Sequence, residues 1–340
     1  MTYLYNAWYA AAWSHEISET LFSRTFLDIP VVLYRNAEAK VIALHDRCPH
    51  RFAPLSMGQI VEGRLRCGYH GLSFDEAGAC VHSLMSTVAP KAAKVRAFAV
   101  HEQDKMVWIW MGDAAPGDTA AIPRLPHHTD EVMSCNFGLT TAKADYRLLS
   151  DNLMDLTHTA LLHPAFGGLD YIAKTKSWEE DGQVVSDHVV EDMPAFFAPG
   201  TDLKVHNRDT IRWIAPATHI LESRITPMDD ANWETYIPSA HILTPESRKT
   251  THYFWSSASH KDSGVSDEAM MATLIQAFDF EDKPMVEAVQ QRMGDADLWD
   301  LNPVLLPADA GGVRVRRRLA ALIESEQAAR AAEAVATPAG

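Results

Sequence analysis

Cysteine is scarce in this chain, with four among 340 residues. Cys80 and Cys135 belong to no spacing typical of a disulfide framework, so we expect both to be free thiols. Basic side chains are also few, with 30 Lys and Arg against 45 Asp and Glu and a formal net charge of -15. Because phosphate binding needs clustered Lys and Arg, this balance argues against a nucleic-acid or anionic-membrane surface.

Long apolar runs are absent too, and none reaches the roughly eighteen residues that a membrane helix needs. The first residues, MTYLYNAWYAAAW, lack the basic start and the small-residue cleavage site of a secretion signal. We therefore expect a cytoplasmic protein. The length and the 47% hydrophobic content allow two domains with substantial cores.

The pattern of apolar segments changes along the chain and predicts an α+β protein. From about residue 20 to 112, short apolar segments alternate with turn signals, as in an antiparallel β domain. Later segments mix helical and strand patterns, as in an antiparallel sheet flanked by helices. The predicted parts are an N-terminal β domain (1–115), a linker rich in Pro and Gly (116–130), an α+β domain (131–325) and a flexible tail (326–340). No structure is predicted for 164–205.

Two short motifs, CPH and CGYHG, place Cys48, His50, Cys67 and His70 in two loops separated by sixteen residues. Two thiolates and two imidazoles are the ligands of a Rieske two-iron two-sulfur cluster, in which histidines hold one iron. A structural zinc ion accepts the same ligand types. Zinc fingers pair two cysteines in one arm and two histidines in the other, whereas each arm here supplies one of each. The mixed arms therefore favour the Rieske cluster, which transfers single electrons.

A second group of metal-ligand residues lies in the segment DNLMDLTHTALLH, which contains Asp155, His158 and His163. Two histidines and a carboxylate make the facial triad of non-haem iron(II) oxygenases. On a regular helix the two histidines lie about 140° apart, so both can face one ion only if the helix is distorted. The alternative is the exposed polar face of an amphipathic helix. An electron-transfer motif upstream favours the metal site.

The third ligand of this group is open from the residues alone. Asp155 lies three residues before His158, so the two side chains would share a helix face. A carboxylate in that position orients a ligating imidazole, which suits Asp155 better to a bridging role than to ligation. The segment FDFEDKPMVEAV then offers Asp279, Glu281 and Asp282 as the third ligand.

Together these motifs resemble the oxygenase components of Rieske aromatic O-demethylases, such as the vanillate and dicamba enzymes. The similarity runs from NAWYAAAW through DNLMDLTH and HILTPES to EDKPMVEA. It implies a Rieske 2Fe-2S cluster held by the two loops and a mononuclear non-haem Fe(II) held by His158, His163 and Asp282. It also implies that Asp155 is the bridging carboxylate and that Asn152 lies near the iron.

The resemblance further implies a head-to-tail homotrimer. Electrons would pass from the cluster of one subunit through His70 to Asp155 and His158 of the next. The chain has no GxGxxG fingerprint and no plant-type ferredoxin spacing, so flavin, nicotinamide and ferredoxin chemistry must lie in a separate NADH-dependent reductase.

The expected reaction is oxidative O-demethylation of a methoxylated, vanillate-like aromatic acid, using O2 and releasing formaldehyde. His241 in HILTPES matches a histidine near the substrate in similar enzymes, although an ordinary half-buried strand histidine would fit the pattern equally. The helix before Asp282 has Phe278 and Phe280 where the dicamba type has a tryptophan, which argues against dicamba itself. Alternatives are hydroxylation of a ring-methyl or N-methyl group, a ring cis-dihydroxylase, and a non-enzymatic electron carrier.

Overall fold

A computed structural model describes residues 2–164, 173–195, 202–228, 234–264 and 266–336. By the contacts between its residues the chain forms two compact units. One comprises residues 5–124 together with 245–247, and the other comprises 1–4, 125–244 and 248–340. The division along the sequence falls between Arg124 and Leu125.

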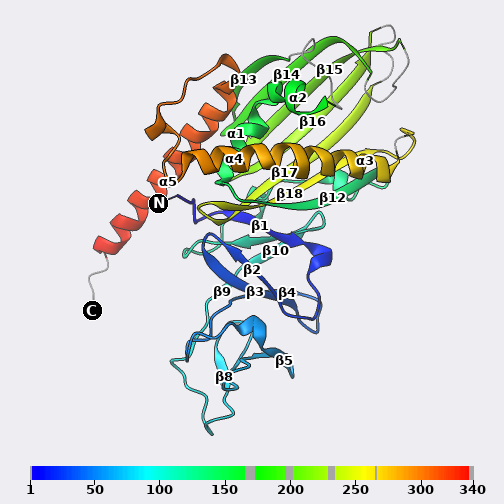
Figure 1. The fold of residues 1–340 in the computed structure, drawn as a ribbon. Helices are drawn as coiled ribbons and strands as arrows, with labels where there is room; N and C mark the ends of the chain where they lie inside the picture. The colour runs from blue at the N-terminus through cyan, green and yellow to red at the C-terminus, as the bar shows by residue number, and fades with distance from the viewer. Residues whose placement is uncertain (1, 165–172, 196–201, 229–233, 265, 337–340) are drawn as a thin grey trace. The chain divides into compact units, whose positions relative to one another are not determined.

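The first unit consists of three antiparallel sheets (Figure 1). One sheet contains β1 (Trp8–Trp13), β11 (Met106–Trp110) and β10 (Val100–Gln103). The second contains β2 (Phe22–Phe26), β3 (Ile29–Arg35), β4 (Val41–His45) and β9 (Ala97–Phe98). The third contains β5 (Gln59–Val61), β6 (Arg64–Arg66), β7 (Ser73–Phe74) and β8 (Cys80–His82). Strands β10 and β11 form a hairpin whose turn residues, Asp104 and Lys105, both have positive φ.

The second unit is built on one seven-stranded sheet with the order β12-β18-β17-β16-β15-β14-β13. Its strands are β12 (Met133–Ala142), β13 (Lys174–Glu180), β14 (Gln183–Pro194), β15 (Lys204–Ile214), β16 (Thr218–Pro227), β17 (Thr235–Ser247) and β18 (Thr250–His260). The helices are α1 (Tyr146–Met154), α2 (Thr159–Leu162), α3 (Asp267–Ile275), α4 (Lys283–Met293) and α5 (Ala310–Ala336). The predicted α+β class, with a β domain followed by a sheet flanked by helices, is confirmed.

A π-helical segment, Gln276–Asp282, joins α3 to α4 into one continuous rod that crosses the sheet near β17, β18 and β12 (Figure 1). Ser266 caps the start of α3, where its side chain accepts a hydrogen bond from the backbone N–H of Ala269 at 3.1 Å. Segments of π-helix are rare and occur mostly at functional sites. This one contains the acidic cluster that the sequence offers as a source of metal ligands.

The C-terminal segment differs from the predicted flexible tail, because α5 continues to Ala336. Alanine has the highest helix propensity of all residues, so the small residues that suggested disorder stabilise a helix instead. An ion pair between Glu326 and Arg330, at 3.0 Å and one turn apart, adds to this. Arg316, in the basic start of the same helix, is buried rather than solvated and pairs with Asp151 at 2.6 Å. Among the described residues no helix combines the length and apolar composition needed to cross a membrane.

Candidate metal centres

The two loops that carry the predicted cluster ligands have the same backbone hydrogen bonds. In the first, the N–H of Cys48 donates to the carbonyl of Ala53 at 2.9 Å, and the N–H of Phe52 donates to the carbonyl of Cys48 at 2.9 Å. In the second, Cys67 and Gly71 stand in the equivalent positions, with distances of 2.8 and 3.1 Å. Phe52 and Gly71 both have positive φ, of 60° and 72°. Both loops are therefore folded alike around their cysteine.

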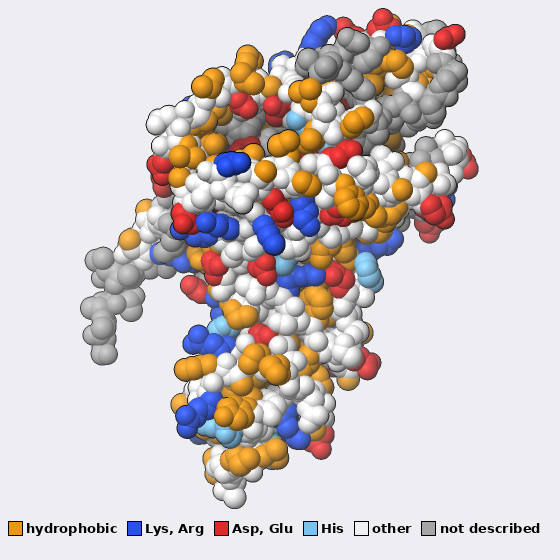
Figure 2. Space-filling model, in the orientation of Figure 1, with side chains coloured by type: hydrophobic (Ala, Val, Ile, Leu, Met, Phe, Trp, Pro, Cys, Tyr) orange, Lys and Arg blue, Asp and Glu red, His pale blue; other side chains and the backbone are white. Residues whose placement is uncertain are grey.

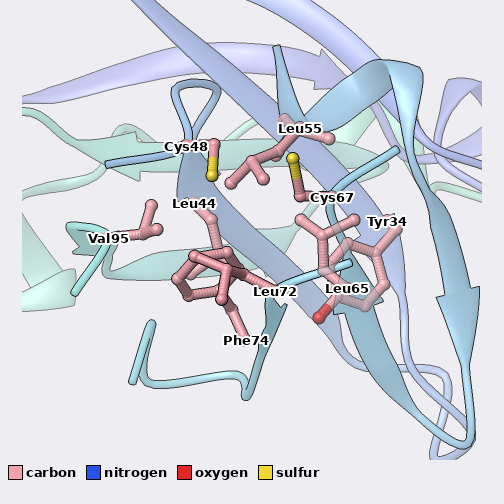
Figure 3. Close-up of a cluster of buried hydrophobic side chains, with 10 residues drawn as sticks. Tyr34, Leu44, Cys48, Leu55, Leu65, Cys67, Leu72, Phe74 and Val95 are labelled. Atoms are coloured by element: carbon pink, nitrogen blue, oxygen red, sulfur yellow. The ribbon is translucent and has the colours of Figure 1, made fainter. Parts of the chain in front are cut away.

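The thiols of Cys48 and Cys67 are buried and lie on the same side of a packed apolar core (Figure 3). Burial raises the pKa of the Cys48 thiol to about 11, and the neighbouring Cys67 adds to the shift. The rings of His50 and His70 lie 4.5 Å apart. Nδ1 of His70 is buried without a hydrogen-bond partner among the described residues. Two adjacent thiols beside two imidazoles, one with an unsatisfied nitrogen, fit a cluster with two cysteine and two histidine ligands.

The second group of ligands depends on a break in the helix that contains Asn152 and ends before His158 and His163. Helix α1 ends at Met154, and Asp155 leaves the helical conformation with φ -124° and ψ 92°. A short 3-10 turn, Leu156–His158, and α2 follow before His163. The break supplies the distortion that two histidines five residues apart require.

His158, His163 and Asp282 come together as a compact group of possible metal ligands. One ligand atom from each lies within 4.8 Å of the other two. Oδ1 of Asp282 is 3.4 Å from Nε2 of His158 and 3.3 Å from Nε2 of His163. His163 and Asp282 are buried, and His158 is partly buried. Two imidazoles and one carboxylate converging in this way fit the facial triad of a mononuclear iron.

Asn152 lies beside this group, as the resemblance implied. Its Nδ2 donates to Oδ1 of Asp282 at 3.0 Å and lies 3.3 Å from Nε2 of His158. Burial alone would raise the pKa of Asp282, but the contacts with His158 and His163 dominate and hold that pKa well below its usual range. The carboxylate therefore stays ionised, as a metal ligand must.

The outer nitrogens of the two imidazoles are held by different acceptors. Nδ1 of His158 lies 2.5 Å from the backbone carbonyl of Asp155, whereas Nδ1 of His163 lies 2.7 Å from Oε2 of Glu281. The expected hydrogen bond from the His158 imidazole to the Asp155 carboxylate is absent. That carboxylate instead accepts from the N–H and hydroxyl of Thr157, at 2.9 and 2.7 Å, and caps the 3-10 turn. Each imidazole thus has its outer nitrogen occupied and Nε2 facing the group.

The three acidic residues that were candidates for the third ligand lie in the π-helical segment, and each contacts a different partner. Asp282 faces the two histidines, and Glu281 orients His163 while accepting from Nε2 of Gln276 at 3.0 Å. Asp279 accepts from the hydroxyl of Thr140 on β12 at 2.7 Å. The role of Glu281 as the partner of an imidazole was missed. Its position next to Asp282 was the available signal, since ligating histidines usually donate to a carboxylate or carbonyl.

His241 lies on β17 and is 3% exposed. Its Nδ1 is 2.7 Å from the hydroxyl of Tyr253, on the neighbouring strand β18, which the sequence did not single out. Its Nε2 is buried without a hydrogen-bond partner among the described residues. Phe278 from the π-helical segment packs edge-on against the imidazole, with ring centroids 5.4 Å apart. The buried Nε2 without a partner leaves one hydrogen-bonding position of His241 that a ligand could fill.

A small cavity adjoins the metal-ligand group. It has a volume of about 10 Å³, room for about one water molecule. Its lining comprises Thr140, Ala142, Leu149, Asn152, Leu153, Tyr253, Phe278, Asp282, Lys283 and Val286. Apolar side chains make up about half of this lining, and Asn152 and Asp282 contribute polar groups.

A further cluster of metal-binding residue types, His127, His128 and Cys135, lies elsewhere in the second unit. Nε2 of His128 is 2.7 Å and Nε2 of His127 is 3.4 Å from the buried hydroxyl of Ser256. The hydroxyl can donate to one ring and accept from the other, so this network needs no metal to satisfy it.

Comparison with known proteins agrees with these two centres. Residues 7–98 match the Rieske [2Fe-2S] domain, and residues 142–325 match the vanillate O-demethylase oxygenase C-terminal domain. The dicamba O-demethylase oxygenase component of Stenotrophomonas maltophilia is 36% identical over 96% of this chain and its own full length. The chain belongs to the Rieske oxygenases.

Two further comparisons agree with this assignment. The chloroacetanilide N-alkylformylase oxygenase component of Rhizorhabdus wittichii is 32% identical over 95% of this chain and 97% of its own. The crystal structure of dicamba monooxygenase bound to 3,6-dichlorosalicylic acid superimposes with a TM-score of 0.88 and 35% identity, covering 96% of this chain and all of that one. As in its relatives, this oxygenase component requires electrons from a separate reductase.

Proposed function

We propose that this chain is the terminal oxygenase that removes the methyl group of a methoxylated aromatic acid as formaldehyde. The main support is the compact, largely buried group of His158, His163 and Asp282. The unsatisfied Nε2 of His241 lies in the same unit. The balanced reaction consumes one O2, two electrons and two protons. The methyl carbon gains a hydroxyl group, the resulting hemiacetal collapses to a phenol and formaldehyde, and the second oxygen atom leaves as water. An iron held by the triad would supply the activation of O2.

The chain's own residues prepare this site before any substrate arrives. The Asp155 carbonyl and the Glu281 carboxylate fix the two imidazole rings, and Asn152 fixes one oxygen of Asp282. Their positions support ligand roles for the triad and a positioning role for Asn152. Cys48, His50, Cys67 and His70 are the proposed cluster ligands.

His241 is the proposed contact for the polar group of the substrate. Burial holds the pKa of its imidazole at about 4, only partly opposed by Asp282. The ring is therefore neutral at physiological pH and contributes a hydrogen bond rather than a charge. Such an anchor in an apolar surrounding would orient an aromatic ring while leaving its methoxy group free to approach the triad.

We also propose that the chain acts in the cytoplasm as a head-to-tail homotrimer, in which Asp155 contacts His158 through its backbone carbonyl and His70 of the neighbouring subunit through its carboxylate. Exposed apolar side chains near the cluster loops support such an interface; they are Phe52, Met57, Tyr69, Leu84, Met85 and Val88. Figure 2 shows hydrophobic and histidine side chains gathered over this part of the first unit. The proposed reductase carries flavin and a ferredoxin-type cluster and takes electrons from NADH.

The decisive experiment measures O2 uptake and formaldehyde with the reconstituted enzyme, a reductase, NADH and a panel of methoxybenzoates. Equal amounts of phenol and formaldehyde support O-demethylation. Toluene sulfonate is included because it offers a ring-methyl group. An N-alkyl anilide is included because one relative of this chain is a chloroacetanilide N-alkylformylase oxygenase component. A hydroxymethyl or N-dealkylated product, with no formaldehyde from any methoxybenzoate, would overturn the proposal in favour of those reactions.

Asp155→Asn tests the proposed link between subunits, with Asp118→Asn as the matched control, because the exposed Asp118 carboxylate also caps a 3-10 turn and accepts from the backbone N–H of Ala120 at 2.9 Å. The link predicts that Asp155→Asn keeps both metal centres loaded while turnover falls by about 100-fold or more. Near-normal turnover of Asp155→Asn, or an equal loss in Asp118→Asn at full metal content, would contradict it.

A further inference from the structure

We propose that Tyr253 is a positioning residue that fixes His241 in the tautomer with hydrogen on Nε2, so that the imidazole presents a neutral N–H donor to the substrate. The inference rests on the proposed function only in taking His241 as the substrate contact. It adds the residue that sets the polarity of this contact. It also defines the atom type that the substrate must bring, which is a hydrogen-bond acceptor.

Neighbouring strands hold the two side chains together. His241 on β17 and Tyr253 on β18 are 3% and 4% exposed, and the Tyr253 hydroxyl lies 2.7 Å from Nδ1 of His241. Phe278 packs against both rings, with centroids 5.4 Å from His241 and 5.6 Å from Tyr253. The three rings restrict one another, so the imidazole cannot easily turn to exchange its nitrogens.

Counting hydrogens decides which of the two groups donates. If Nδ1–H of His241 donated to Tyr253, both the tyrosine O–H and the lone pair of Nε2 would be buried without partners among the described residues. If the O–H of Tyr253 donates to Nδ1, only the N–H at Nε2 remains unsatisfied. Buried polar groups without partners are costly, so the second arrangement is favoured. A ligand acceptor atom then completes the network.

Neither Tyr253 nor His241 changes its protonation state near neutral pH. Burial raises the pKa of Tyr253 well above 10, and Asp282 and Asp279 add to the shift. The hydroxyl therefore keeps the proton that it donates to His241, whose imidazole is also neutral. A neutral N–H can donate to a carbonyl, ether or phenol oxygen as well as to a carboxylate. The proposed carboxylate is thus bound by a hydrogen bond and not by charge.

The tautomer can be read directly by ¹⁵N NMR of the full-length chain with labelled histidine and Zn(II) in place of the mononuclear iron. His241→Gln assigns the signal. We expect the proton on Nε2 in the wild-type chain and a mixture of tautomers in Tyr253→Phe. Tyr236→Phe is the matched control, because its hydroxyl donates to Glu222 at 2.8 Å and should leave His241 unchanged. A wild-type signal with the proton on Nδ1, or no change in Tyr253→Phe, would refute the assignment.

Kinetics test the consequence for the substrate. The pair compared is the methoxybenzoate that the wild-type enzyme demethylates fastest and the methoxytoluene of the same substitution pattern. Loss of the positioning hydroxyl should raise KM for the methoxybenzoate about 5–20-fold, with kcat within about 2-fold and KM for the methoxytoluene unchanged. An equal rise for both compounds would indicate a merely structural role. If no methoxy compound yields formaldehyde, the proposed reaction fails, while the NMR result still decides the tautomer.

Discussion

The carboxylate of Glu281 offers a sharp test of how the chain holds its mononuclear centre. It accepts a hydrogen bond from Nδ1 of His163 at 2.7 Å and is itself held by Gln276 at 3.0 Å. Partners of this kind contribute about 10- to 100-fold to metal affinity. Because the Glu281 side chain is 17% exposed, solvent screens part of its charge. We therefore expect Glu281→Ala to weaken Fe(II) binding about 10- to 30-fold, which corresponds to roughly 1.4–2 kcal/mol.

Glu281→Gln should lose less, about 3-fold, because an amide oxygen can still accept from His163. Glu287→Gln is the matched control, since this carboxylate in α4 accepts from the backbone N–H of Lys143 at 2.8 Å and touches no proposed ligand. The assay is competition for Fe(II) against a chelator under anaerobic conditions, with the visible spectrum of the cluster as an internal check. Wild-type affinity in Glu281→Ala would refute the reasoning, as would an equal loss in Glu287→Gln.

Three further predictions concern stability and the cluster. Asp151→Ala leaves the buried guanidinium of Arg316 without its carboxylate, which should lower the free energy of unfolding by about 2–3 kcal/mol; an unchanged urea midpoint would contradict this. Burial raises the pKa of the half-buried Asp209 carboxyl to about 6, against the hydrogen bond from Ser223. A carboxyl group with a raised pKa in the folded chain stabilises the fold below about pH 4, and this contribution is lost as the pH rises through about 6. The stability of Asp209→Asn relative to wild type should therefore increase by about 1–2 kcal/mol as the pH rises from about 4 to about 6. A pH-independent difference in denaturation would exclude this. Cys48→Ser should lose the visible spectrum of the cluster but keep the mononuclear iron, and retained colour would remove Cys48 from the ligand set.

Local motifs allowed most of the proposed ligands to be found without a structure. Cys48, Cys67 and their histidines stand in short loops whose chemistry depends on residue type and spacing. His158 and His163 were recognisable for the same reason, although their spacing conflicts with a regular helix. The conflict correctly pointed to a distortion, which the structure places at Asp155.

Contacts between distant segments were beyond the reach of the sequence. Asp279, Glu281 and Asp282 all carry carboxylates, so residue chemistry alone left the third ligand open. The resemblance pointed to Asp282, and the π-helical segment gives each carboxylate a different partner. Tyr253 meets His241 because β17 and β18 are neighbours in the sheet. In the segment that was predicted as a flexible tail, 326–340, alanine favours helix and α5 continues to Ala336, whereas 337–340 lie outside the described residues.

The central claim is that one chain holds two separate metal centres, and iron content tests it most directly. Iron and acid-labile sulfide should be measured in the wild-type chain and in Asp282→Ala, with Asp279→Ala as the neighbouring control. We predict about three irons and two sulfides per wild-type chain, and about two irons with an unchanged cluster spectrum in Asp282→Ala. Two irons in the wild-type chain, or full iron content in Asp282→Ala, would contradict the account.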